Sequence, residues 1–256
     1  MEVFVSSGRR GAEAGAEQGL VTVIVDALRA SATLTSLLQF GATECLVVEQ
    51  VSQALAEKAA RPSCLLVGER DSLKVEGCDL GNSPLTCACP GLPAPVVFTS
   101  SNCSRCCVGA AGAPRLFVGS VVNATALASA VAAAARELGA GVLLVPAGYA
   151  EDETCFNLED HLACGAILRA LEAAEPRTRV ANDAARAAQG LYARTGPRGL
   201  PVAFTRTDHG RRLVEQGFEA DVRWAAKLDV YTAVATLGAT RPLPDGGLGA
   251  VLQACP

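Results

Sequence analysis

The fold is decided by residues 21–29, VTVIVDALR, in which an apolar run leads to a small polar residue and then to an arginine. Residues 96–105, VVFTSSNCSR, repeat this arrangement. Asp26 and Asn102, which follow the apolar runs, are residue types that often cap the N-terminus of a helix. We therefore predict a strand followed by a helix at both places, which is the repeating unit of an α/β fold.

The two arginines, Arg29 and Arg105, each lie three residues after the expected helix cap. A positive charge at a helix start opposes the helix dipole and costs roughly a few tenths of a kcal/mol. Backbone N–H groups at a helix start bind anions, and a guanidinium group can hold phosphate or carboxylate with two parallel hydrogen bonds. A bound anion would offset the cost, so we expect a small anionic ligand at these positions.

Composition favours one large α/β domain spanning residues 1–256. Half of the residues are apolar and only 4% are aromatic, so the core must consist mainly of Ala, Val and Leu, as in helices packed on a parallel sheet. The 22 basic and 26 acidic residues leave a net charge of −4, which gives no support for nucleic-acid or acidic-membrane partners. No secretory signal is visible and residues 124–135 are too weakly apolar to span a bilayer, so we expect a cytoplasmic protein.

Strand and helix patterns alternate along the chain. This alternation predicts a largely parallel or mixed sheet covered by helices on both faces, and the repeated strand–cap–arginine unit is compatible with two similar subdomains. A long polar loop over residues 68–93 interrupts the alternation. The expected strands are 1–5, 21–25, 45–48, 64–67, 95–98, 116–118 and 142–145, and the expected helices are 30–40, 51–60, 123–138, 157–174, 182–192 and 208–216, with a short one from 102.

Ligands of such folds bind beyond the carboxyl ends of the strands. The polar residues that follow the expected strands are Asp26 and Arg29, Glu69 and Arg70, Asn102 and Arg105, Gly119 and Ser120, and Ala147 and Gly148. Each also has a purely structural interpretation. Asp26 can be a helix cap, and Glu69 with Arg70 can be a solvated ion pair.

Two later segments have the same ambiguity. Glu159 and Asp160 fit a capping box behind Asn157, and they equally fit a Mg²⁺ site, since this ion prefers carboxylate oxygens and water. Asp208 and His209 open another expected helix, where a histidine is more often a surface or capping residue than a catalyst.

Cysteine is abundant, with eleven residues scattered along the chain. Cys87-x-Cys89 and Cys103-x-x-Cys106-Cys107 have spacings seen in zinc sites, but a core strand lies between them and we expect mostly reduced, buried thiols. No GxGxxG, Walker or GxSxG motif follows a strand, so dinucleotide, NTP and serine-hydrolase functions lack their signatures.

Several motifs in their order along the chain resemble the 2-phosphosulfolactate phosphatase family of coenzyme M biosynthesis. The resemblance covers almost the whole chain, and the ordered set is more specific than any single motif. The matching segments are VDALRAS at 25–31, GER at 68–70, DLGNSP at 79–84, TSSN at 99–102, GS at 119–120, LED at 158–160 with ACGA at 163–166, and DHG at 208–210 with Gly217, Phe218, Asp221, Val222 and Asp229.

The resemblance implies Mg²⁺-dependent hydrolysis of the phosphate ester of a 2-hydroxy acid, giving the free acid (3-sulfolactate) and phosphate. For this reaction we expect Asp26, helped by Glu159 or Asp160, to hold the metal, and Asp208 or His209 to protonate the leaving oxygen. Attack by water and attack by Asp26 through an acyl-phosphate both remain open. The expected substrate-binding residues are Arg29, Arg105 and Asn102 for phosphate, Arg70 for the carboxylate or sulfonate, and Asn82, Ser83, Ser101 and Ser120 nearby.

One departure bears on activity, because Asn102-Cys103-Ser104 stands where the family usually has Asn-Gly-Thr. A side chain at residue 103 would crowd a backbone that approaches phosphate closely. Other small phosphorylated acids, such as phospholactate and phosphoglycolate, remain open as substrates. A non-catalytic anion sensor is an alternative of another class, and a homodimer is compatible with the sequence, which leaves the oligomeric state open.

Overall fold

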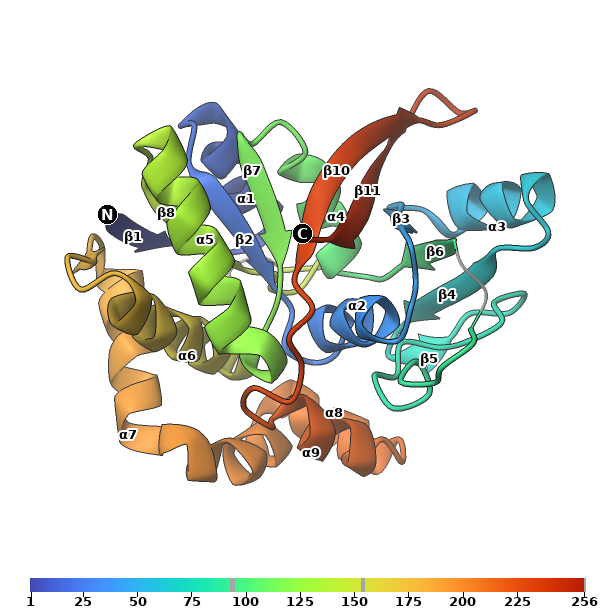
Figure 1. Ribbon diagram of the computed structural model, residues 1–256. Coiled ribbons are helices and arrows are strands. Elements are labelled where there is room, and N and C mark those ends of the chain that lie inside the picture. Colours follow the sequence, from blue (N-terminus) through green and yellow to red (C-terminus); the bar gives the residue numbers. More distant parts are fainter. Residues whose placement is uncertain (93–94, 153–154, 256) are drawn as a thin grey trace.

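The apolar runs of the sequence form one mixed sheet with helices on both of its faces (Figure 1). The computed structural model describes residues 1–92, 95–152 and 155–255. Within these residues the sheet has eleven strands, in the order β5-β4-β6-β3-β11-β10-β7-β2-β8-β1-β9. The α/β class that the sequence predicts is therefore confirmed.

Two blocks of parallel strands make up most of the sheet. The larger block holds β7 (Arg115–Val118), β2 (Val21–Val25), β8 (Val142–Pro146), β1 (Glu2–Val5) and β9 (Arg179–Val180). The smaller block holds β3 (Cys45–Val47), β6 (Val96–Thr99) and β4 (Leu65–Arg70), with the short antiparallel β5 (Leu73–Lys74) at its edge.

The strand β2 shows why the larger block is so apolar. Val23 packs into the core on the side of α5 (Ala124–Leu138) and α6 (Leu158–Ala174). Its neighbour Ile24 packs into the opposite core, beside α1 (Gly8–Glu17) and α4 (Cys103–Gly109). Because both faces are covered, every residue of this strand is buried and the sequence shows a continuous apolar run.

The remaining helices complete the smaller block and the C-terminal part. They are α2 (Ala30–Gln39), α3 (Val51–Ala60), the 3₁₀ turn Val121–Asn123, α7 (Asp183–Arg206), α8 (Asp208–Glu215) and α9 (Glu219–Ala225). The long helix α7 bends at Gly196, whose φ of 63° is not helical. Figure 1 shows α8 and α9 below α2, beyond the ends of the strands.

The helix α1 is a correction, because residues 8–17 are not among the helices expected from the sequence. Its glycines lower helix propensity but allow close packing. A Cβ at Gly15 would lie 2.4 Å from Thr22 Oγ1, and one at Gly11 would lie 2.3 Å from the carbonyl oxygen of Ser6. The glycines therefore let the helix lie directly on the strands.

One helical stretch in the described residues, Val121–Leu138, is long and apolar enough to cross a membrane by length and composition, with a mean hydropathy of 1.2. However, 56% of it is buried inside the protein. Leu127 and Val131 belong to the core shared with β2 and α6. This burial is the pattern of a core helix.

A hairpin of β10 (Ala235–Pro242) and β11 (Leu248–Ala254) lies between the two blocks. It pairs antiparallel with β7 on one side and with β3 on the other. In a flat sheet these three antiparallel pairings would point the two blocks in opposite directions. Residues that follow β2, β4, β6 and β8 nevertheless line one pocket, so the sheet is strongly twisted, and a register shift between Leu237 and Ala239 lies in this hairpin.

Candidate active site

A small polar cavity of about 80 Å³ lies where the carboxyl ends of both blocks meet. Its walls come from the segments after β2, β4, β6 and β8, and from α8. The lining residues are Asp26, Leu28, Arg29, Glu69, Asp71, Ser72, Asn82, Ser101, Asn102, Tyr149, Ala150, Glu151, His209 and Arg212. This position agrees with the rule for ligand sites in parallel sheets.

Asp26 lies on the floor of the cavity, directly after β2, and is only 5% exposed. Its backbone N–H donates to Ser31 Oγ at 2.9 Å, and its Oδ1 accepts from the Ala30 N–H at 3.3 Å. Burial raises the pKa of Asp26 to about 6, with Glu69 and Glu159 adding to the rise and His209 opposing it. A carboxylate that is costly to ionise is a candidate functional group.

Glu69, near the end of β4, is a second buried carboxylate that lines the cavity. Its Oε1 accepts from the Ser101 N–H at 2.7 Å and its Oε2 from the Ser72 N–H at 3.0 Å. Asp71 and Ser72 turn the chain around it with positive φ angles of 52° and 70°. Glu69 belongs to the GER motif of the family resemblance but was not among the expected site residues, although its place directly after an expected buried strand was an available signal.

Arg29 is held in a cradle of buried groups. Its Nη1 donates to Asp221 Oδ2 at 2.8 Å and its Nη2 to the Ser72 carbonyl oxygen at 2.6 Å. The guanidinium carbon also lies 4.1 Å from the ring centre of Phe218. Ser83 donates in turn to Asp221 Oδ1 at 2.7 Å. Ser83 therefore acts on Asp221 and does not itself line the cavity.

Asp160 is buried behind the cavity, where both of its oxygens accept backbone hydrogen bonds. Oδ1 accepts from the Ala27 N–H at 2.8 Å and Oδ2 from the Gly148 N–H at 3.4 Å. Burial raises the pKa of Asp160 well above its usual range, with Asp26 and then Glu159 contributing. Asp160 thus ties together the loops after β2 and β8, and the capping box with Asn157 does not form.

Glu159 and His209 face each other beside the cavity. Glu159 is 2% exposed and its Oε1 has no hydrogen-bond partner among the described residues. This Oε1 lies 3.4 Å from Nδ1 of His209, a contact that is an ion pair only when the imidazole is protonated. The other ring nitrogen, Nε2, lies 3.4 Å from Ser72 Oγ, so His209 spans the space between an acidic group and the cavity wall.

The start of α8 decides which of its residues reach the cavity. Thr207 caps the helix by accepting from the Gly210 N–H at 2.9 Å. His209 and, three residues later, Arg212 face the cavity, as the helical repeat requires. Asp208 instead lies in solvent, paired with Arg211, and does not line the cavity.

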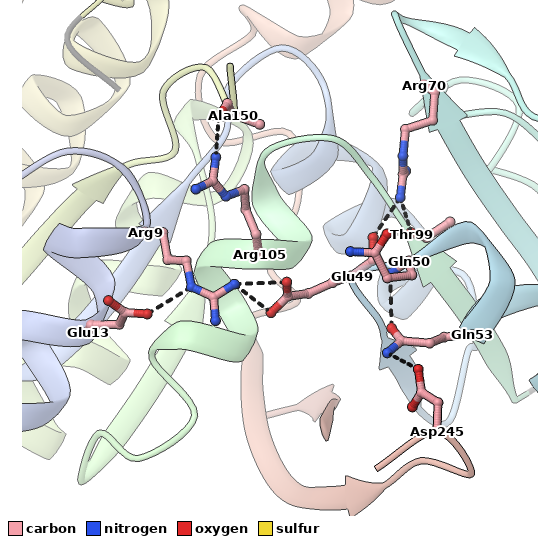
Figure 2. Close-up of polar contacts among 10 residues, drawn as sticks. All are labelled: Arg9, Glu13, Glu49, Gln50, Gln53, Arg70, Thr99, Arg105, Ala150 and Asp245. Atoms are coloured by element: carbon pink, nitrogen blue, oxygen red, sulfur yellow. Dashed lines mark hydrogen bonds and ion pairs between the residues drawn. The ribbon is translucent and has the colours of Figure 1, made fainter. Parts of the chain in front are cut away.

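Arg70 and Arg105 do not line the cavity with Arg29. Arg70 turns back to donate to the carbonyl oxygen of Glu69 at 2.6 Å. It also donates to the Glu49 carbonyl oxygen at 2.6 Å and to Thr99 Oγ1 at 3.0 Å (Figure 2). Arg105 donates to the Ala150 carbonyl oxygen at 2.8 Å (Figure 2). Both therefore stabilise loops around the cavity, and the expected convergence of three arginines is not found.

The polar residues after β6 and β7 have different positions. Ser101 and Asn102 line the cavity. Asn102 Oδ1 accepts from the Ala150 N–H at 2.9 Å and does not cap α4. Ser120 is buried outside the lining, where its N–H donates to Asn123 Oδ1 at 3.1 Å. Cys103 is fully buried with its Sγ 3.8 Å from that of Cys107, so its side chain does not enter the cavity.

The thiols and carboxylates of the described residues do not gather into a metal site with three or more protein ligands. Eight of the eleven cysteines are buried and all are free. In the described parts of the chain, no three His, Cys, Asp or Glu side chains are close enough together to enclose a metal ion. A fully protein-coordinated site such as structural zinc is therefore not present there, whereas Mg²⁺ needs only one or two carboxylates because it retains waters.

The fold and the cavity define an α/β protein with a small, charged ligand site at the carboxyl ends of its parallel strands. Residues 10–239 match the 2-phosphosulpholactate phosphatase family, and the chain belongs to this family.

Individual relatives support this assignment along most of the chain. A protein of Carboxydothermus hydrogenoformans is 34% identical over 213 residues, covering 83% of this chain and 84% of its own. A protein of Deinococcus radiodurans is 33% identical over 230 residues, covering 89% and 92%. Both are named probable 2-phosphosulfolactate phosphatase.

Proposed function

We propose that this protein is a Mg²⁺-dependent phosphatase that hydrolyses 2-phosphosulfolactate, or a closely similar phosphorylated 2-hydroxy acid, to 3-sulfolactate and phosphate. Family membership and the names of the relatives support the reaction. The observation that carries the proposal is the meeting of buried Asp26 and Glu69 with the fixed guanidinium of Arg29 in one small cavity. Its size favours small phosphate esters over nucleotides or peptides.

The acidic residues fit a hard divalent cation. Asp26 presents a buried carboxylate whose ionisation is costly, and Glu159 has a buried oxygen without a hydrogen-bond partner among the described residues. Asp26 would hold Mg²⁺, with Glu159 or Glu69 as the second carboxylate. Asp160 fits less well because both of its oxygens accept backbone N–H bonds. When bound, the cation would neutralise phosphoryl charge and lower the pKa of water.

The protein's own residues supply positioning and proton transfer. Arg29 has five N–H donors. One N–H donates to Asp221 and another to the Ser72 carbonyl oxygen, so the remaining donors can bind phosphoryl oxygens. These contacts fix the orientation of the guanidinium before the substrate binds. A preorganised positive charge of this kind stabilises the transition state of phosphoryl transfer. His209 lines the cavity and can protonate the leaving alkoxide oxygen.

Phosphate release is the direct test of this function. Purified protein should release phosphate from 2-phosphosulfolactate and from 2-phospholactate with Mg²⁺, and EDTA should stop the reaction. Phosphoglycolate serves as the comparison substrate for chain length. Binding of these compounds without turnover would instead support an anion-sensing protein and would refute the phosphatase.

We expect water, and not Asp26, to attack phosphorus. Leu28 stands two residues after Asp26, so the Asp-x-Asp pattern of aspartyl-phosphate enzymes is absent. Protein quenched in acid during turnover of ³²P-labelled substrate should therefore carry no label. Recovery of label on a peptide containing Asp26 would establish the covalent route.

A further inference from the structure

Arg212 differs from the other arginines around the cavity. Its side chain lines the cavity, is exposed, and makes no hydrogen bond or ion pair with a residue that the structure describes. Its charge favours ionisation of the Tyr149 hydroxyl, whose pKa burial raises and which lines the same cavity. Arg29, by contrast, is 3% exposed and paired with Asp221.

The positions of these two arginines define two ends of the cavity. Arg29 and Asp26 are both buried, with 3% and 5% exposed, and belong to the buried end of the lining. Arg212 lies at the solvent end, one helical turn beyond His209 on α8. His209, on the same helix as Arg212, also lines the cavity and can donate the proton that the leaving oxygen must accept.

The charges of the lining residues show why a second cation is needed. Four carboxylates line the cavity, from Asp26, Glu69, Asp71 and Glu151. The charge of Arg29 is already offset by Asp221 at 2.8 Å. A ligand that carries an acid group as well as a phosphate therefore meets net negative charge, unless an unpaired cation receives that acid group.

Buried Asn82 adds an independent sign of an absent ligand. It lines the cavity and is 5% exposed, and its Oδ1 has no hydrogen-bond partner in the described part of the chain. An unsatisfied buried amide is costly. A hydroxyl of the ligand can satisfy this acceptor, and a 2-hydroxy acid exposes such a hydroxyl after its phosphate has left.

Building on the proposed function, we infer that Arg212 determines specificity by binding the carboxylate or sulfonate of the substrate. The phosphate then lies at the buried end with Asp26 and Arg29. This assigns to Arg212 the role that the sequence analysis gave to Arg70. A guanidinium fork suits either acid group.

Ligand binding tests this inference independently of turnover. Titration calorimetry in the presence of Mg²⁺ would measure the Kd of 3-sulfolactate, lactate and inorganic phosphate for three proteins: the wild type, Arg212→Ala and Arg212→Lys. We expect Arg212→Ala to weaken the binding of 3-sulfolactate about 10- to 100-fold, the range for a lost hydrogen bond to a charged group. The binding of inorganic phosphate should be unchanged. Arg212→Lys should recover part of the loss. An equal loss with lactate would identify the carboxylate as the bound group, and a loss confined to 3-sulfolactate would identify the sulfonate.

Arg211→Ala is the matched control, because it removes the same charge one residue away on the face that pairs with Asp208. It should bind all three compounds as the wild type does. In turnover, Arg212→Ala should raise KM for 2-phosphosulfolactate, which carries both acid groups, more than it lowers kcat, the sign of lost uniform binding. The inference would be overturned if Arg212→Ala weakened the binding of phosphate and of 3-sulfolactate equally, or weakened neither. It would also be overturned if the wild type did not bind 3-sulfolactate. A wild type that binds 3-sulfolactate without releasing phosphate would overturn only the phosphatase.

Discussion

Asp26→Asn is expected to abolish phosphate release and, at the same time, to make the metal-free protein more stable above pH 6. The loss of activity should reach at least about 10²- to 10³-fold, the effect of removing one preorganised electrostatic group from an active site. The gain in stability follows from burial. Above pH 6 the wild-type protein must keep the Asp26 carboxyl group ionised, although this group is only 5% exposed.

The sign of the pH dependence follows from the raised pKa of Asp26. The pKa rises from 3.8 in the unfolded chain to about 6 in the folded protein, so the folded state binds more protons between these values. Stability therefore falls as pH rises from about 4 to about 6. The full cost persists above pH 6 and amounts to roughly 1 to 3 kcal/mol. Asparagine keeps the acceptor for the Ala30 N–H and removes this cost.

Thermal unfolding of the wild type and of Asp26→Asn between pH 4 and pH 8, with and without Mg²⁺, measures both effects. The curves should separate as pH rises, and Mg²⁺ should raise Tm of the wild type alone. Asp183→Asn, an exposed carboxylate at the start of α7, is the control and should follow the wild type in activity and in pH dependence. A variant that retained activity would remove Asp26 from the chemistry.

Asp221→Ala should destabilise the folded protein by about 3 to 5 kcal/mol, because it leaves the buried guanidinium of Arg29 without its counter-ion. The side chains of the pair are only 2% and 6% exposed. The same change frees Arg29 from its fixed orientation, so kcat should fall as well. Urea unfolding with the change in midpoint and slope measures the stability effect.

Two further variants separate charge from packing. Asp183→Ala breaks the exposed pair with Arg186 and should cost under about 1 kcal/mol. The double variant Arg29→Met with Asp221→Leu replaces both buried charges by apolar groups and should recover most of the lost stability without recovering activity. If Asp221→Ala cost no more than Asp183→Ala, the cradle around Arg29 would not be a structural element.

Local patterns in the sequence were sufficient for most helices and buried strands. The predicted helix at 157–174 forms as Leu158–Ala174, and the one at 123–138 as Ala124–Leu138. Strand β2 was evident because both of its faces are covered and no polar residue interrupts it. Asp26, Arg29, Ser101, Asn102 and His209 line the cavity, and each lies after an expected strand or at an expected helix start. Asn82 lines it as well, but it was expected only from the family resemblance.

The remaining features depend on distant parts of the chain. β10 and β11 occupy the centre of the sheet through pairings with β7 and β3, which no local periodicity reveals. Arg70 lies at the end of β4 and Arg105 follows β6. Their guanidinium groups nevertheless donate hydrogen bonds to backbone carbonyls of neighbouring loops. Arg212 had a local signal, since it lies three residues after His209 on the same helix, but only the packing of α8 shows which face meets the cavity.

The central position of β10 and β11 also constrains how the protein is made. A ribosome releases the chain from its N-terminus, so both parallel blocks emerge before the hairpin that joins them. Until residue 254 has been synthesised, β3 and β7 are unpaired edges, which are prone to pairing with other chains. The cavity forms between the two blocks, so a nascent chain that lacks its last two strands has neither a complete sheet nor a complete site.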